Sequence, residues 1–184
     1  MSGTLYRLIL AGLGNVGRSF LGILRSQEPL LRDRYGVTFS VVGVADSSGA
    51  AADPAGVDIE QILEAKRAGR GAATLPGLGR AGVDGVELAR TLDADILVEA
   101  TPTNLQHGQP GLDTVRAALG RGMHAVLANK GPLVLAYAEL AAMSDLAQNK
   151  ETKRQGDAGE ERKEKSEENT ALLAPRSSRI TERP

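Results

Sequence analysis

Four short stretches of this chain carry residue types that can bind or transform a small molecule. They are the glycine-rich run at 12–17, Asp46, the segment 101–104 and Lys130. The chain has no cysteine, which excludes disulfides, thiolate nucleophiles and cysteine-ligated metal sites. Its two histidines are spaced neither for a metal nor for a catalytic triad, so no metal site is predicted.

The glycine-rich run has the spacing of a dinucleotide-binding turn. Its members are Gly12, Leu13, Gly14, Asn15, Val16 and Gly17. The first glycine permits a tight turn out of a strand, the second lets the backbone approach a pyrophosphate, and the third lets a helix pack on the sheet. Free N–H groups at the start of that helix favour a bound anion. A purely structural turn is the alternative, but a strand, a helix and a second strand surround the motif and favour nucleotide binding.

Asp46 closes the second predicted strand, where a carboxylate can accept hydrogen bonds from adenosine ribose hydroxyls and would repel a 2′-phosphate. It follows Gly17 by more than the roughly 20 residues typical of this position. An extra loop over residues 28–36 would account for the difference. No lysine or arginine follows Asp46 before Lys66. NAD is therefore favoured over NADP as the cofactor; the alternative is a turn residue that bonds its own backbone.

Polar side chains also follow the third and fourth predicted strands. Thr101, Thr103 and Asn104 lie at the carboxyl end of the third strand, the edge where open α/β sheets bind ligands. A plain turn around Pro102 is the alternative. Lys130 follows the fourth strand, and its ammonium group could polarise a carbonyl or assist proton transfer beside a nicotinamide. A solvated surface lysine is the alternative for this residue.

The elements that must position these residues alternate between strands and helices. Short apolar runs predict strands over 6–11, 37–45, 95–100 and 124–128. Amphipathic spacing predicts helices over 15–26, 58–68, 86–92, 111–119 and 132–147. This order predicts an α/β fold with a Rossmann-type, doubly wound and mostly parallel sheet.

Two local features refine the prediction for the first half of the chain. In the first helix, an apolar face is expected from Val16, Phe20, Ile23 and Leu24, and Pro29 is expected to end the helix. Residues 69–82 contain five glycines and one proline, which predicts a loop without regular structure.

The composition bounds the class of protein and its partners. The net charge is −1, aromatic residues make up 3% and tryptophan is absent, which argues against nucleic-acid binding. No apolar run approaches the roughly 20 residues that span a bilayer, and no signal peptide is recognised. We therefore expect a cytoplasmic protein without membrane or nucleic-acid partners.

The last part of the chain differs in composition from the rest. Residues 148–184 mix acidic and basic side chains, and their only aliphatic cluster is 171–174. Such a segment cannot bury enough apolar surface to offset about 1–2 kcal/mol of backbone entropy per residue. We expect a nucleotide-binding domain over 1–147 and a disordered tail over 148–184, either as an interaction segment or as a solvated extension.

Together these segments resemble the N-terminal part of homoserine dehydrogenases. The matching pieces are GLGNVG at 12–17, VVGVADSSG at 41–49, VEATPTN at 98–104 and GQPGLDTVRAALGRGMHAVLANKGPLVLAY at 108–137. The resemblance implies NAD(P)-linked interconversion of L-homoserine and L-aspartate 4-semialdehyde, in the biosynthesis of threonine, methionine and isoleucine. It also implies that the three motif glycines surround the pyrophosphate, that Thr101, Thr103 and Asn104 lie near the nicotinamide, and that Lys130 is catalytic or substrate-adjacent.

The resemblance stops at about residue 147. The family continues into a substrate and dimerisation domain, so we expect this chain to bind cofactor, to lack most of the family's homo-oligomer surface and to be inactive unless a substrate domain is supplied. Three hypotheses follow: an enzyme of this family, a fragment that only binds cofactor, or another dehydrogenase of the same nucleotide fold. The ANKGPL and EATPTN segments argue against the third.

Overall fold

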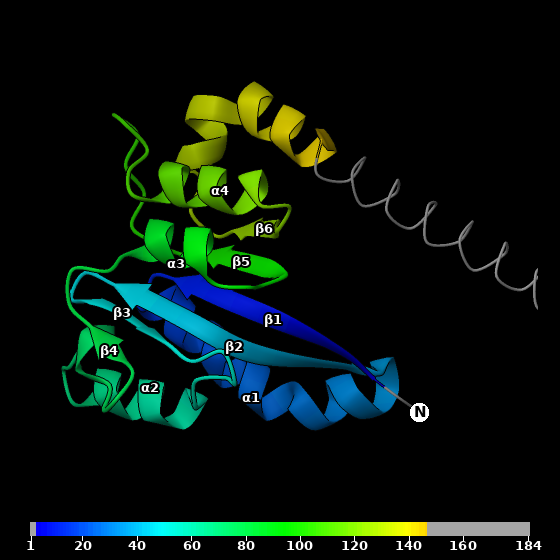
Figure 1. The fold of residues 1–184 in the computed structure, drawn as a ribbon, viewed down its shortest axis with the longest axis vertical. Helices are drawn as coiled ribbons and strands as arrows, with labels where there is room; N and C mark the ends of the chain where they lie inside the picture. Colours follow the sequence, from blue (N-terminus) through cyan, green and yellow to red (C-terminus); the bar gives the residue numbers. More distant parts are fainter. Residues whose placement is uncertain (1–2, 147–184) are drawn as a thin grey trace, which may run out of the picture. The chain divides into compact units, whose positions relative to one another are not determined.

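The computed structural model describes residues 3–146, and the predicted tail lies outside the described residues. A six-stranded sheet runs through the domain in the order β4-β3-β2-β1-β5-β6 (Figure 1). The strands are β1 (Thr4–Ala11), β2 (Val37–Asp46), β3 (Gly49–Ala52), β4 (Gly79–Arg80), β5 (Ile96–Glu99) and β6 (His124–Leu127). Strands β2, β1, β5 and β6 are parallel, whereas β3 and β4 form an antiparallel edge.

Helices cover both faces of this sheet (Figure 1). They are α1 (Asn15–Tyr35), α2 (Ile59–Arg67), the short 3-10 helix η1 (Ala72–Thr74), α3 (Gly85–Thr91), α4 (Gly111–Gly120) and a final helix over residues 131–146. Side chains alternate along β1: Leu8 and Leu10 pack with α1 and α2, while Ile9 and Ala11 pack with α3 and α4. Because β1 is buried on both faces, its residues 8–11 read as a continuous apolar run. The Rossmann-type, doubly wound α/β prediction is confirmed.

Helix α1 is longer than the sequence suggested. It continues through Pro29 to Tyr35 and ends at Gly36, which adopts a left-handed conformation with φ of 65°. The predictions that Pro29 ends the helix and that residues 28–36 form a loop are therefore wrong. Pro29 is exposed, so the missing N–H and the ring are accommodated on the solvent side, away from the core. The long helix, not a loop, accounts for the separation between Gly17 and Asp46.

The predicted apolar face of α1 is also partly wrong. Val16 and Ile23 are 58% and 60% exposed, while Gly17, Leu21 and Leu24 are the buried residues of the helix. These three are spaced four and three residues apart, which places them on one side of a helix. The buried face is thus shifted by about one residue, because Gly17 packs directly against Gly12 and Leu10, where a Cβ would not fit.

The sequence did not predict the antiparallel edge. β3 consists of glycine and alanine, and β4 of only two residues, so neither carries the β-branched pattern of a strand. Backbone pairing holds them in place: β3 pairs with β2, with Asp46 opposite Gly49, and β4 pairs with β3. Residues 69–82 were expected to form a loop without regular structure, but they contain η1 and β4.

Among residues 3–146, no helix combines the length and apolarity that a bilayer span requires.

The helix over residues 131–146 packs beside α4 and is tied to it by one arginine. Arg116 of α4 donates two hydrogen bonds to the carboxylate of Glu139, from Nε at 2.7 Å and from Nη2 at 2.8 Å. Leu140 is buried in the same cluster as Val115 of α4. This contact fixes the helix whose first residues follow β6 at the carboxyl edge of the sheet.

Candidate functional site

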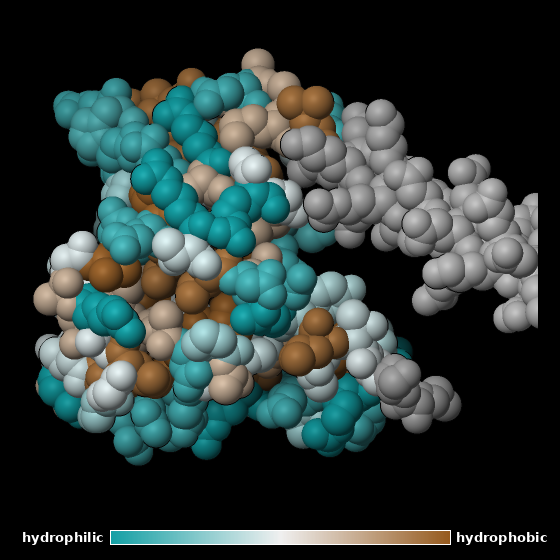
Figure 2. All heavy atoms as spheres, viewed as in Figure 1, coloured by the Kyte–Doolittle hydropathy of each residue, from teal (hydrophilic) through white to brown (hydrophobic). Residues whose placement is uncertain are grey.

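A cleft of about 680 Å³ opens at the carboxyl edge of the parallel strands. In the space-filling view, apolar residues gather on the side of the molecule where these strand ends lie (Figure 2). The lining residues come from the ends of β1, β2, β5 and β6 and from the helices that follow. They are Ala11, Gly12, Leu13, Gly14, Asn15, Val16, Ala45, Asp46, Ser47, Lys66, Asp84, Gly85, Ala100, Thr101, Pro102, Thr103, Pro110, Thr114, Ala128 and Asn129.

The glycine motif forms the turn between β1 and α1, as predicted. Gly12 has φ of 102°, and a Cβ there would lie 2.4 Å from the carbonyl oxygen of Ala100. A Cβ on Gly17 would lie 2.0 Å from the carbonyl oxygen of Gly12. By contrast, a Cβ on Gly14 would meet no atom of residues 3–146 within 4 Å. The first and third glycines are therefore required by packing, and the second leaves open space in front of the backbone.

Arg18 stabilises this turn through two side-chain hydrogen bonds. Its Nε donates to the carbonyl oxygen of Gly14 at 3.2 Å, and its Nη2 donates to Oδ1 of Asn15 at 2.6 Å. Gly14 and Asn15 both line the cleft. The guanidinium thus orders the mouth of the site and adds a positive charge near the helix N-terminus, which favours an anion there.

Asp46 lies at one end of the cleft, beside the glycine turn, and its carboxylate already accepts hydrogen bonds from donors of this chain. Its carboxylate accepts from Ser48 N at 2.9 Å, from Ser48 Oγ at 2.6 Å and from Lys66 Nζ at 2.8 Å. The N–H of Ala72 donates to both oxygens at 3.3 Å. Four donor groups fill the roughly four lone-pair positions of a carboxylate. A ribose hydroxyl would therefore share or displace one of them.

Lys66 is a neighbour of Asp46 in the cleft that the sequence did not predict. It lies 20 residues further along the chain, on α2, yet its ammonium group forms an ion pair with Asp46. Burial by itself would raise the pKa of Asp46, but the hydrogen bonds from Lys66 and Ser48 and the charge of Lys66 outweigh it and lower the pKa. Asp46 is therefore ionised at neutral pH, beside a cation that also faces the cleft.

Glu99 stands at the other side of the glycine turn, as the last residue of β5. Its side chain is 0% exposed. Oε1 accepts from the N–H of Thr101 at 2.8 Å, from the Thr101 hydroxyl, and from Nδ2 of Asn129 at 3.4 Å. Burial raises the pKa of Glu99, and the hydrogen bonds from Thr101 and Asn129 offset only part of that effect. The signal in the sequence that points to Glu99 is an acidic residue at the end of the apolar run 96–98.

Of the other predicted site residues, some line the cleft and others do not. Thr101 and Thr103 line the cleft beside the glycine turn. Asn104 does not line it, because its Oδ1 accepts from the N–H groups of Gln106 and His107 and so caps a local turn. Gly17 is buried beneath the turn, and Lys130 is exposed beyond the end of β6, outside the residues that line the cleft. Asn129, which precedes it, is 3% exposed and is the residue that reaches the site.

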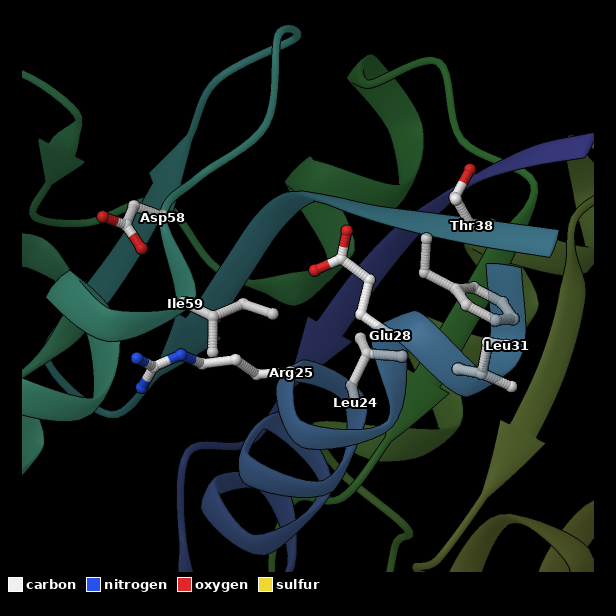
Figure 3. Close-up of a pocket in the computed structure, with 8 residues that line it drawn as sticks. Leu24, Arg25, Glu28, Leu31, Thr38, Asp58 and Ile59 are labelled. Carbon is white, nitrogen blue, oxygen red and sulfur yellow. The ribbon is translucent and has the colours of Figure 1, made fainter. Parts of the chain in front are cut away.

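A second, smaller pocket of about 270 Å³ lies away from this edge, between α1, the beginning of β2 and the beginning of α2 (Figure 3). Its walls mix apolar side chains such as Leu24 and Leu31 with Arg25 and Glu28. Arg25 forms an ion pair with Glu60. The pocket contains none of the predicted site residues. Within residues 3–146, no group of three or more histidine, aspartate or glutamate side chains could hold a metal ion.

The raised pKa of Glu99 predicts how stability depends on pH. A carboxyl group whose pKa is higher in the folded state than its ordinary 4.5 lowers stability as pH rises through and above that value. Glu99→Gln keeps an acceptor at the position of Oε1 and removes the charge. We expect the variant to match the parent chain near pH 4 and to gain stability relative to it by pH 7, measured by thermal unfolding. A difference that is constant across this range would contradict the raised pKa.

Comparison with known proteins agrees with this geometry. A family model described as the NAD-binding domain of homoserine dehydrogenase matches residues 12–155. The chain is 35% identical over 133 residues to homoserine dehydrogenase from Methanocaldococcus jannaschii, covering 72% of this chain and 39% of that protein. It is 34% identical over 142 residues to NAD(+)-dependent homoserine dehydrogenase from Pseudomonas canavaninivorans, covering 77% and 40%. The chain thus spans about two fifths of the length of these relatives.

Solved structures give the same result. Homoserine dehydrogenase from Thermoplasma acidophilum superposes with a TM-score of 0.59 at 29% identity, covering 79% of this chain and 41% of that one. A hyperthermophilic archaeal homoserine dehydrogenase in complex with NADPH superposes with a TM-score of 0.66 over 79% and 42%, and at 22% identity it supports the fold alone. The chain belongs to the homoserine dehydrogenase family, of which it carries the NAD-binding domain.

Proposed function

We propose that the chain binds NAD(P) across the carboxyl edge of the sheet, with the pyrophosphate at the glycine turn. The observation that carries this proposal is the open space in front of Gly14, where a Cβ would meet no atom, at the start of a 21-residue helix. The first turn of α1 contains no acidic residue, and Gly14 supplies no capping side chain. The free N–H groups of the helix thus remain available to an anion.

The two ends of the cleft suggest how the dinucleotide is oriented. In this type of sheet, the adenosine ribose lies beside the acidic residue at the end of the second strand, here Asp46. The nicotinamide then lies on the other side of the glycine turn, beside Thr101, Thr103 and Asn129. These side chains supply hydroxyl and amide groups that can hydrogen-bond a carboxamide. They lie at the edge that a substrate would approach.

We infer that NAD is the favoured cofactor and that Lys66 weakens the discrimination against NADP. The Asp46 carboxylate would repel a 2′-phosphate, but the ammonium group of Lys66 lies 2.8 Å from it and neutralises part of that charge. Lys66 can donate to a ribose hydroxyl or to a phosphate. The relative from Pseudomonas canavaninivorans is named as NAD(+)-dependent, which agrees with this preference.

For this chain together with a substrate domain such as the family carries, we propose the family reaction, the interconversion of L-homoserine and L-aspartate 4-semialdehyde by hydride exchange with NAD(P), as a step in amino-acid biosynthesis. The supporting observation is that Asn129, Lys130 and Gly131 lie at the end of β6, next to the nicotinamide side of the cleft. Lys130 is exposed there, where it could face a substrate bound by the rest of such a protein. Its proposed role is to polarise the carbonyl or assist proton transfer during hydride exchange.

The pyrophosphate proposal predicts a selective effect of one methyl group. Gly14→Ala should fold, because the new Cβ meets no atom of residues 3–146 and the change costs only the small N-cap preference of glycine over alanine. It should weaken NADH binding by about tenfold or more, because the methyl group enters the space needed by the pyrophosphate. NADH fluorescence titration measures the affinity. Gly22→Ala on the same helix, where a Cβ also meets nothing, is the matched control; equal affinities for all three proteins would contradict the proposal.

The charge arrangement at the adenosine end predicts opposite changes in cofactor preference. Lys66→Met should reduce NADPH affinity more than NADH affinity, because it leaves Asp46 without its cation. Asp46→Asn should do the reverse and raise the relative affinity for NADPH, by about tenfold, since a charged hydrogen bond contributes about 1.5–3 kcal/mol. Parallel titrations with both cofactors give the ratio. If both variants shift the ratio in the same direction, this pair does not select the cofactor.

A further inference from the structure

Glu99 has a fully buried carboxyl group that the proposed function does not yet use. Its Oε2 is buried and has no hydrogen-bond partner among residues 3–146, while Oε1 accepts three hydrogen bonds. A carboxyl group with an unpaired buried oxygen is unfavourable for folding. Residues that break such a local rule are concentrated at functional sites. The position of Glu99, directly behind the cleft, is consistent with such a role.

The contacts of Glu99 join two segments that are distant in sequence. Through Oε1 it holds the backbone and the hydroxyl of Thr101, and it also accepts from Nδ2 of Asn129. The same Nδ2 donates to Thr101 Oγ1 at 3.3 Å, and Asn129 Oδ1 accepts from Gly131 N at 2.9 Å. The carbonyl oxygen of Glu99 accepts from the N–H groups of Ala128 and Asn129 at 2.9 and 3.3 Å. One residue thus orders both the loop after β5 and the turn after β6.

We propose that Glu99 is a positioning residue for the cofactor, which holds Thr101 and Asn129 in the arrangement that binds the nicotinamide end of NAD(P). This inference rests on the proposed cofactor binding and adds a residue to it. The adenosine end of the cleft is built from Asp46 and Lys66, on β2 and α2, and the contacts of Glu99 do not include them. Loss of Glu99 should therefore affect one end of the dinucleotide and leave the other unchanged.

The first residue of α4 packs against this network from behind. A Cβ on Gly111 would lie 2.7 Å from Nδ2 of Asn129 and 3.0 Å from Oε1 of Glu99. Gly111 is buried and is not among the residues that line the cleft. A methyl group at this position would therefore displace the Glu99–Asn129 contact without touching a bound nucleotide. The far end of the same helix offers a control, since a Cβ on Gly120 would meet only Met143 Cε, at 3.9 Å.

The test compares two ligands that share the adenosine end and differ at the other. NADH carries the nicotinamide, whereas ADP-ribose carries the same adenosine and pyrophosphate without it. Calorimetric titration of the full chain with each ligand should show that Glu99→Leu weakens NADH by about tenfold, equivalent to one or two hydrogen bonds. ADP-ribose affinity should change by no more than about twofold, a range that corresponds to a small part of one hydrogen bond.

The conservative variant separates geometry from charge. Glu99→Gln retains a carbonyl oxygen that can accept the same hydrogen bonds from Thr101 and Asn129, so NADH affinity should return close to that of the parent chain. If Glu99→Gln weakens NADH as much as Glu99→Leu does, the charge of Glu99 acts directly and the positioning role is wrong. Equal losses for NADH and ADP-ribose would instead show a general structural role. An unchanged NADH affinity in Glu99→Leu would also overturn the inference.

Gly111→Ala decides the question if Glu99→Leu does not fold. It should weaken NADH and spare ADP-ribose, while Gly120→Ala should change neither; a Gly111→Ala chain that binds NADH normally would overturn the inference. The parent chain separates this inference from the proposed function. If the parent chain binds neither ligand, the cofactor proposal fails and the inference fails with it. If the parent binds both and the Glu99 and Gly111 variants bind as the parent does, only the inference fails.

Discussion

The close approach of Gly12 to the end of β5 is the constraint on which the rest of the site depends. No side chain fits at Gly12, because a Cβ would lie 2.4 Å from the Ala100 carbonyl oxygen, nor at Gly17, where it would lie 2.0 Å from the Gly12 carbonyl oxygen. The turn therefore brings the N-terminus of α1 to the centre of the carboxyl edge. The other residues of the proposed site lie on either side of this point, Asp46 and Lys66 on one side and Thr101, Thr103 and Asn129 on the other.

The acidic groups on the two sides of this turn have pKa values shifted in opposite directions. At Asp46, the hydrogen bonds from Lys66 and Ser48 and the charge of Lys66 outweigh the cost of burial and lower the pKa of the carboxyl group. At Glu99, burial is the larger effect and the pKa rises, since within residues 3–146 only Thr101 and Asn129 donate to its carboxylate. In the proposed orientation, the adenosine side is thus suited to selecting charge on the ribose, and the nicotinamide side to fixing the geometry of uncharged polar groups.

The sequence predicted the features that depend on short-range patterns. The apolar parallel strands, the glycine turn and the position of Asp46 follow from spacing within a few residues, and the structure has them. It did not predict that α1 passes through Pro29, because that depends on the proline facing solvent. The β3 strand was missed because its glycine and alanine residues are held by pairing with β2. At the site, Lys66 and Asn129 were missed because they lie 20 and 30 residues from the carboxylates they contact.

The central claim is that the dinucleotide lies along the carboxyl edge of the sheet, across the glycine turn. Amide NMR spectra of the ¹⁵N-labelled chain, recorded during titration with NADH, test it most directly. The account predicts shifts concentrated at residues 12–16, at Lys66 and Thr101 and around Asn129, with the amides around Leu24 and Phe39 in the second pocket unchanged. Shifts centred on that second pocket, or no shifts at saturating NADH, would contradict the account.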